Sequence, residues 1–195
     1  MASLLSYLNS SHPITWFVLG WLSLYFIVTF TIFIGRMLYL SSWKNREKQS
    51  VESMLLGSKR PGSNSILSKC SSGTISAPRL NVCKNIAENN AIAGLSWLSV
   101  IASTSPFIGL FGTVVSILET FSKLGQSSSA SLNVIAPAIS EALIATAAGI
   151  FVAIPAYTFY IVLKKNAFTI ISLVQRQIEL ILSHDMIKDN QKSDV

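Results

Sequence analysis

Residues 134–163 have the sequence VIAPAISEALIATAAGIFVAIPAYTFYIVL, a run of 30 residues in which Glu141 is the only ionisable side chain apart from two tyrosines. At about 1.5 Å per residue, a helix of this length exceeds the ~30 Å hydrocarbon layer of a bilayer. Glu141 would then lie roughly 10 Å from the start of the span. Inserting a carboxylate into the membrane at that depth costs a free energy on the order of 2 to 4 kcal/mol, so we expect this side chain to face water or a partner protein.

Two further apolar runs, residues 14–40 and 91–121, are also long enough to cross a membrane as helices. Hydrophobic residues make up 50% of the 195 residues and charged residues only 12%, and the mean hydropathy is +0.51. A soluble domain of this length is normally much richer in charge. The sequence therefore predicts an all-α, polytopic membrane protein with three long transmembrane helices that extend into the cytoplasm.

The basic residues predict which way the chain crosses the membrane. All but two of the 15 Lys and Arg residues lie in a connection spanning 41–90 or in a tail spanning 164–195. These segments are expected to be cytoplasmic, because short loops rich in Lys and Arg stay on that side. Residues 1–13 and 122–133 are expected to lie outside. The two exceptions are Lys123 and Arg36, which can reach the cytoplasmic surface from the end of the first span.

The cytoplasmic segments are predicted to be helical. Residues 44–56 continue the first span, residues 61–65 break the helix, and Pro78 opens another helix that leads into the second span. An amphipathic helix is predicted over 167–183, with its apolar stripe packed on neighbouring subunits rather than on the lipid surface. Its stripe consists of Ile171, Val174, Ile178 and Ile181.

Small and hydroxyl side chains recur at helical spacing in two of the spans. Such residues let membrane helices approach closely. Thr113 in the second span and Thr146 in the third could face each other across such a contact. The candidate packing positions are Gly109, Gly112, Ala138, Ala142, Ala145 and Gly149.

Several alternatives remain at this point. The small and hydroxyl residues can serve packing alone, with each Ser or Thr bonded to its own helix. Glu141 can lie at the interface if Pro137 is the first residue of its helix. An enzyme is not expected, because the spans contain no His, Cys or Asp. No cofactor or metal is expected, and no nucleic-acid partner, since the positive charge of +6 is accounted for by the cytoplasmic segments.

Two blocks resemble a known family. Residues 105–114, SPFIGLFGTV, and residues 136–156, APAISEALIATAAGIFVAIPA, are similar to the signature segments of the MotA/TolQ/ExbB proton channel family, in its TolQ/ExbB branch. The resemblance covers residues 97–163 closely and the remainder by layout. Ala138 and Ala148 depart from the usual family residues, and the cytoplasmic connection is short.

The resemblance implies a function. By it, Glu141 matches the pore carboxylate of the family, and Thr113 and Thr146 match the hydroxyls that face it. It further implies a ring-forming homo-oligomer, pentameric in the family, in the cell inner membrane, around an ExbD/TolR-like single-span protein with an aspartate. Proton flow would drive a TonB- or TolA-like protein. The alternative is a non-conducting structural scaffold surrounded by membrane lipid.

Overall fold

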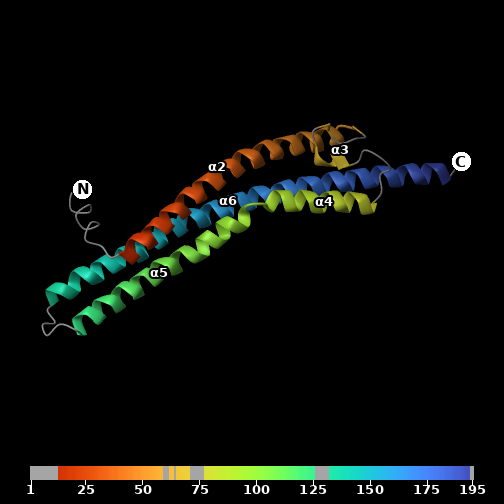
Figure 1. Cartoon of the computed structure of the whole chain (residues 1–195). Helices are drawn as coiled ribbons and strands as arrows, with labels where there is room; N and C mark the ends of the chain where they lie inside the picture. Colours follow the sequence, from red (N-terminus) through yellow and green to blue (C-terminus); the bar gives the residue numbers. More distant parts are fainter. Residues whose placement is uncertain (1–12, 59–61, 64, 71–76, 126–131, 194–195) are drawn as a thin grey trace. The chain divides into compact units, whose positions relative to one another are not determined.

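The computed structural model describes residues 13–58, 62–63, 65–70, 77–125 and 132–193, and all regular structure within them is helical. The helices are α2 (Pro13–Leu55), α3 (Ile66–Cys70), α4 (Ala77–Ile92), α5 (Leu95–Gly125) and α6 (Leu132–Ser193) (Figure 1). Three stretches are long and apolar enough to cross a bilayer, namely Thr15–Leu55, Ala77–Gly125 and Ile135–Ser183. The predicted all-α polytopic membrane fold is confirmed. Residues 1–13 and 122–133 are predicted to lie outside the cell membrane, and most of these residues are not among those that the structure describes.

The first apolar run and the predicted helix over 44–56 form one continuous helix, α2. This helix ends at Leu55 and is capped at its C-terminus by Gly57. Gly57 has a φ of 102°, and the amides of Gly57 and Ser58 donate hydrogen bonds of 3.1 Å to the carbonyls of Met54 and Ser53. A left-handed residue at this place satisfies the last carbonyls of a helix, and glycine adopts it without strain.

A short break separates α4 from α5 near the start of the second predicted span, residues 91–121, although the sequence predicts that a helix opened by Pro78 leads into this span. Pro78 lies in the first turn of α4, where its missing N–H removes no helical bond. The helix ends at Ile92, and Gly94, with a φ of 79°, separates it from α5. The guanidinium of Arg36 donates hydrogen bonds to the carbonyls of Asn90 and Ala91, at 2.7 and 2.9 Å. Arg36, expected only to reach the membrane surface, thus caps the end of α4.

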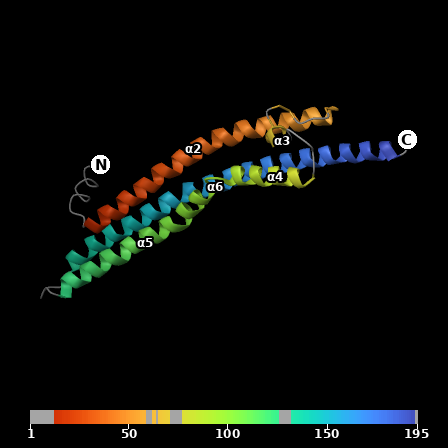
Figure 2. The same ribbon diagram turned by 45° about the vertical axis from the view of Figure 1, so that its right-hand side comes forward.

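The chain divides into two compact units. Unit 1 comprises residues 1–32 and 97–160, and unit 2 comprises residues 33–96 and 161–195. Within unit 1, α2, α5 and α6 run side by side (Figures 1 and 2). Phe26 of α2 stacks on Phe151 of α6 with 5.8 Å between ring centroids. The buried core of unit 1 consists of Val18, Leu22, Ile101, Ala145, Val152 and Ala156.

Many large apolar side chains of unit 1 face outward, among them Phe107, Phe111, Leu118 and Ile154. Exposed apolar surface on this scale marks contact with a membrane or with other chains. These side chains therefore suit the lipid-facing or chain-facing surface of membrane helices.

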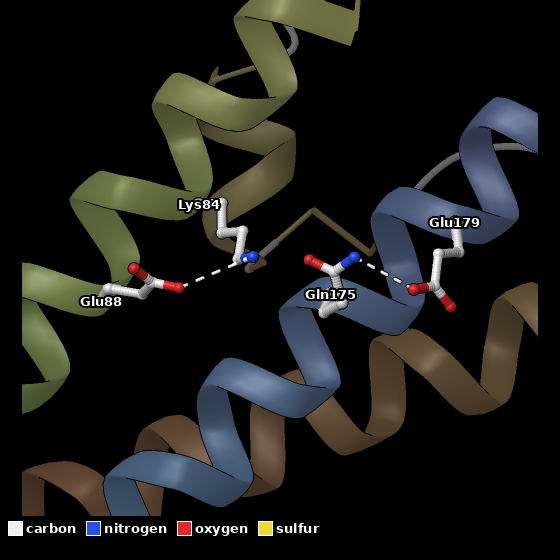
Figure 3. Close-up of polar contacts among 4 residues, drawn as sticks. All are labelled: Lys84, Glu88, Gln175 and Glu179. Atoms are coloured by element: carbon white, nitrogen blue, oxygen red, sulfur yellow. Dashed lines mark hydrogen bonds and ion pairs between the residues drawn. The ribbon is translucent and has the colours of Figure 1, made fainter.

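Unit 2 buries the apolar stripe of the α6 tail within the chain itself. Val174, Ile178 and Ile181 are all buried there. The prediction that this stripe packs on neighbouring subunits is therefore wrong for these three residues. Other polar side chains of unit 2 form pairs one turn apart on the same helix. Lys84 lies 3.8 Å from Glu88 on α4, and Gln175 donates a 3.0 Å hydrogen bond to Glu179 on α6 (Figure 3).

Candidate functional site

A pair of glycines brings α5 and α6 into close contact within unit 1. A Cβ on Gly109 would lie 2.7 Å from the carbonyl oxygen of Ala145, and one on Gly149 would lie 2.6 Å from that of Ser105. Backbone atoms cannot turn aside as a flexible side chain can. Both positions therefore require glycine, as in the small-residue contacts of other membrane helices.

The other candidate packing residues surround this contact. A Cβ on Gly112 would lie 3.1 Å from the Cβ of Ala145 and 3.3 Å from Val18 Cγ1, so α2 also closes in here. Ala142 and Ala145 are buried, and Ala138 is half-buried. The helices therefore meet through small side chains along this face.

Two hydroxyl groups lie at the centre of the contact. Thr113 of α5 and Thr146 of α6 hydrogen-bond to each other. Thr113 also contacts the carbonyl oxygens of Gly109 and Ala142, both at 3.2 Å, and Thr146 contacts that of Gly109 at 3.3 Å. Each hydroxyl carries one proton, so only two of these contacts can be donated hydrogen bonds at a time. The pair can therefore exchange donor and acceptor roles.

Glu141 lies on α6 directly before Ala142, whose carbonyl Thr113 contacts, and its side chain is half-buried. The helix begins at Leu132 and contains Pro137 in its interior. The alternative in which Pro137 is the first helical residue is therefore wrong. Glu141 lies well beyond the first turn, where the favourable field of a helix N-terminus has faded.

This arrangement places a carboxyl group and a hydroxyl pair in the membrane-spanning parts of α5 and α6, which are largely apolar. A hydroxyl both donates and accepts hydrogen bonds, whereas an ionised carboxylate only accepts them and a protonated carboxyl group can also donate one. In membranes, such groups mark ion pathways and proton relays, although hydroxyls bonded to their own helix also occur in plain packing contacts. Among the described residues, no three His, Cys, Asp or Glu side chains gather closely enough to hold a metal ion.

Sequence reasoning missed a buried polar cluster in unit 2. Glu47 is fully buried, and its carboxylate accepts hydrogen bonds from Trp43 Nε1, the amide of Ile66 and Gln177 Nε2, at 3.0, 2.9 and 2.7 Å. The Ser65 hydroxyl lies 2.9 Å from both Glu47 Oε2 and Gln177 Oε1. One signal was present in the sequence, since Gln177 lies directly beside Ile178 and three residues after Val174, next to the apolar stripe of the predicted tail helix.

The comparisons with known proteins agree with these features. A sequence profile of the MotA/TolQ/ExbB proton channel family matches residues 78–176, which include the hydroxyl pair and Glu141. A biopolymer transport protein named ExbB-like 1 from Helicobacter pylori is 41% identical over 184 residues, 93% of this chain and 97% of the relative.

Shorter matches join the chain to both named branches. The Tol-Pal system protein TolQ of Haemophilus influenzae is 49% identical over 80 residues, 39% of this chain and 35% of the relative. The biopolymer transport protein ExbB of Pseudomonas putida is 39% identical over 108 residues, 54% of this chain and 32% of the relative. With its glycine contact, its hydroxyl pair and a relative matched almost end to end, this polytopic membrane protein belongs to the MotA/TolQ/ExbB proton channel family.

Proposed function

We propose that this chain is the proton-conducting subunit of an ExbB/TolQ-like motor in the cell inner membrane. Copies of it form a pentameric ring around single-span helices of an ExbD/TolR-like partner that carries an aspartate. Proton flow through the shared pore does mechanical work on a TonB- or TolA-like protein, either for biopolymer import across the outer membrane or for envelope constriction. Each proton releases about 2.3 kcal/mol per 100 mV of membrane potential.

The Thr113–Thr146 hydroxyl pair is the observation that carries this proposal. It lies where two apolar helices meet, and it contacts the carbonyl of the residue that follows Glu141. A helix contact made only for packing is served equally well by alanine and glycine. In the proposal, Glu141 is the charge at the pore wall, and the two hydroxyls hydrogen-bond to water or to the partner's aspartate.

The proposed orientation places the N-terminus in the periplasm and the C-terminus in the cytoplasm. It rests on the Lys and Arg residues of 41–90 and 164–195, against the single Lys123 on the opposite side. The outward-facing apolar side chains of unit 1, such as Phe107 and Phe151, supply surface for neighbouring copies and for lipid. We further propose that the chain has no enzymatic activity of its own.

A non-conducting scaffold is the alternative, and replacing Glu141 distinguishes the two. The chain is expressed with its ExbD/TolR-like partner, and the purified complex is placed in vesicles that contain a pH-sensitive dye. Proton entry is recorded under an imposed membrane potential, and assembly is followed by native mass spectrometry. The matched control is Glu179→Gln, on the same helix but exposed and bonded to Gln175.

We expect Glu141→Gln to assemble normally and to reduce proton entry to the level of protein-free vesicles, while Glu179→Gln conducts like the wild type. Normal proton entry through Glu141→Gln would exclude a pore role for this carboxyl. In that case the scaffold would become the better description, with the hydroxyl pair serving to hold α5 and α6 together.

A further inference from the structure

The charged side chains of unit 1 gather at one end of it. In the part of this unit that the structure describes, they are Glu119 and Lys123 of α5 and Glu141 of α6. Lys123 Nζ lies 3.0 Å from Glu119 Oε1, and the glutamate side chain is 31% exposed. Charged groups within membrane helices are costly and usually belong to a pathway for ions or protons. Glu119 is therefore a candidate for a role beside that of Glu141.

Glu119 and Glu141 lie within about one turn of each other along unit 1. Helices α5 and α6 run side by side in opposite directions (Figure 1). Counted from the hydrogen-bonded pair Thr113 and Thr146, Glu119 is six residues further along α5, and Glu141 is five residues back along α6. At a rise of about 1.5 Å per residue, both glutamates lie roughly 7 to 9 Å from the pair, toward the same end of unit 1.

The two glutamates also belong to the faces through which α5 and α6 meet. A Cβ on Gly112 of α5 would lie 3.1 Å from the Cβ of Ala145 on α6. Glu119 follows Gly112 by seven residues, and Glu141 precedes Ala145 by four. These spacings keep residues on one face of a helix. Both carboxyl groups therefore lie along the same contact rather than on opposite surfaces of the two helices.

A third helix contributes a hydroxyl group to this end of the contact. A Cβ on Gly112 would also lie 3.3 Å from Val18 Cγ1 of α2. Thr15 precedes Val18 by three residues, is only 2% exposed, and its hydroxyl has no hydrogen-bond partner among the described residues. Because α2 and α6 run in the same direction, Thr15 is displaced from this contact toward the end that holds Glu141 (Figures 1 and 2). A buried hydroxyl is costly to leave unpaired, so its place indicates a polar function.

We propose that Glu119 passes protons between the water at this end of unit 1 and Glu141, with the Thr15 hydroxyl linking the two carboxyl groups. The Glu119 carboxylate takes a proton from a hydronium ion, which becomes water. Glu119 then gives this proton to the Thr15 oxygen while the hydroxyl gives its own proton to the Glu141 carboxylate, so Glu119 is ionised again and Thr15 stays neutral. The proposal rests on the proposed function, in which Glu141 is the charge at the pore wall, and adds the group that supplies its proton.

The vesicle assay separates a proton carrier from an ion pair that only holds the end of α5 in place. Glu119→Gln removes the carboxyl group and the ion pair together, whereas Lys123→Gln removes only the ion pair. We expect Glu119→Gln to assemble and to lower proton entry roughly 10-fold or more, and Lys123→Gln to conduct at least as fast as the wild type. The control is Glu52→Gln, which breaks an exposed pair with Lys48 in unit 2 and should conduct normally.

Thr15→Val tests the hydroxyl link and also serves if Glu119→Gln fails to assemble. Valine keeps the branched shape of threonine but cannot donate or accept a hydrogen bond, so proton entry should fall while assembly is kept. Thr15→Ser should restore proton entry. The control is Thr31→Val on the same helix, because Thr31 is exposed and donates to the carbonyl of Ile27 at 2.9 Å.

Three outcomes would overturn the proposal. They are normal proton entry in Glu119→Gln, an equal loss in Glu119→Gln and Lys123→Gln, and a loss in Glu119→Gln that disappears in about 1 M salt, where the long-range attraction of a carboxylate for protons is screened. Normal proton entry in Thr15→Val would likewise exclude the hydroxyl link. Glu141→Gln is measured beside these variants. Normal conduction by Glu141→Gln would contradict the proposed function itself, whereas its failure to conduct beside a normal Glu119→Gln would contradict only the role of Glu119.

Discussion

The side-chain amide of Gln177 donates a 2.7 Å hydrogen bond to Oε2 of Glu47, a residue 130 positions earlier in the chain. Both side chains are fully buried in unit 2. A buried carboxylate is tolerated only when hydrogen bonds replace the water it has lost. Because Ile66 at the start of α3 donates to the same carboxylate, Glu47 links α2, α3 and α6 within unit 2.

Gln177→Leu is expected to destabilise this part of the chain. Leucine has a similar volume but removes the Gln177 donor, so Oε2 of Glu47 keeps only the Ser65 hydroxyl. The loss of one hydrogen bond to a buried charged group costs about 1.5 to 3 kcal/mol. The change should appear as a lower Tm when thermal unfolding of the detergent-solubilised protein is followed by circular dichroism.

The matched control for this prediction is Gln175→Leu. Gln175 lies on the same helix and donates to Glu179 at 3.0 Å, but this pair is exposed to solvent (Figure 3). Its loss should cost no more than about 0.5 kcal/mol. If the two variants had the same Tm, the buried cluster would contribute nothing beyond an ordinary surface pair.

Gly149→Ala should disrupt the contact between α5 and α6. The added Cβ would lie 2.6 Å from the Ser105 carbonyl oxygen, so the helices must separate and lose packing contacts. We expect a loss of about 1 to 3 kcal/mol and reduced proton flux in vesicles. Gly20→Ala is the control, because a Cβ there meets nothing within 4 Å. A Gly149→Ala protein as stable and active as Gly20→Ala would show that the helices can separate at no cost.

Thr146→Val tests whether the hydroxyl pair serves conduction. Valine has nearly the same shape, and hydroxyls bonded across membrane helices contribute only about 0.6 kcal/mol on average, so the complex should assemble. Proton flux is nevertheless expected to fall, because Thr113 loses its hydroxyl partner. Thr146→Ser should restore the flux.

The control for this test is Thr158→Val on the same helix. Thr158 is exposed and donates to the carbonyl of its own helix at Ile154, at 2.9 Å. Its replacement should leave flux and stability unchanged. Normal flux in Thr146→Val would contradict a conducting role and leave the pair as a packing contact.

The long helices could be predicted because each depends on a local pattern. A continuous apolar run specifies a membrane helix whatever its neighbours are, and the small residues around Gly149 specify a close contact. The break at Gly94 was not predicted, because the apolar sequence continues through Ile92 and Leu95 and a single glycine is tolerated in a helix. The start of α6 was also left open by the sequence, because proline occurs both at the first position and in the interior of membrane helices, so Pro137 does not by itself fix where the helix begins.

The buried cluster could not be predicted, because it depends on which residues meet in space. Glu47 lies among charged residues of a predicted cytoplasmic helix, where a glutamate is normally exposed. Its partner Gln177 is 130 residues away, and no local periodicity connects the two. The contact between Thr113 and Thr146 differs in this respect, because both lie on helices whose small-residue faces already point to one shared interface.

Arg36→Gln is expected to loosen the junction between α4 and α5. Its guanidinium donates to the carbonyls of Asn90 and Ala91, which are among the last of α4 and lack helical partners of their own. Hydrogen bonds from a charged donor are worth about 1.5 to 3 kcal/mol, so amides of the last turn of α4 should exchange at least about tenfold faster in hydrogen–deuterium exchange.

Two further variants serve as controls for this prediction. Arg36→Lys keeps the charge but not the planar guanidinium, and its exchange rate should lie between those of the wild type and Arg36→Gln. The exposed Arg46→Gln removes the same charge from α2 and should leave this exchange unchanged. Equal exchange in Arg36→Gln and Arg46→Gln would mean that Gly94 alone terminates α4 and that the arginine cap is dispensable.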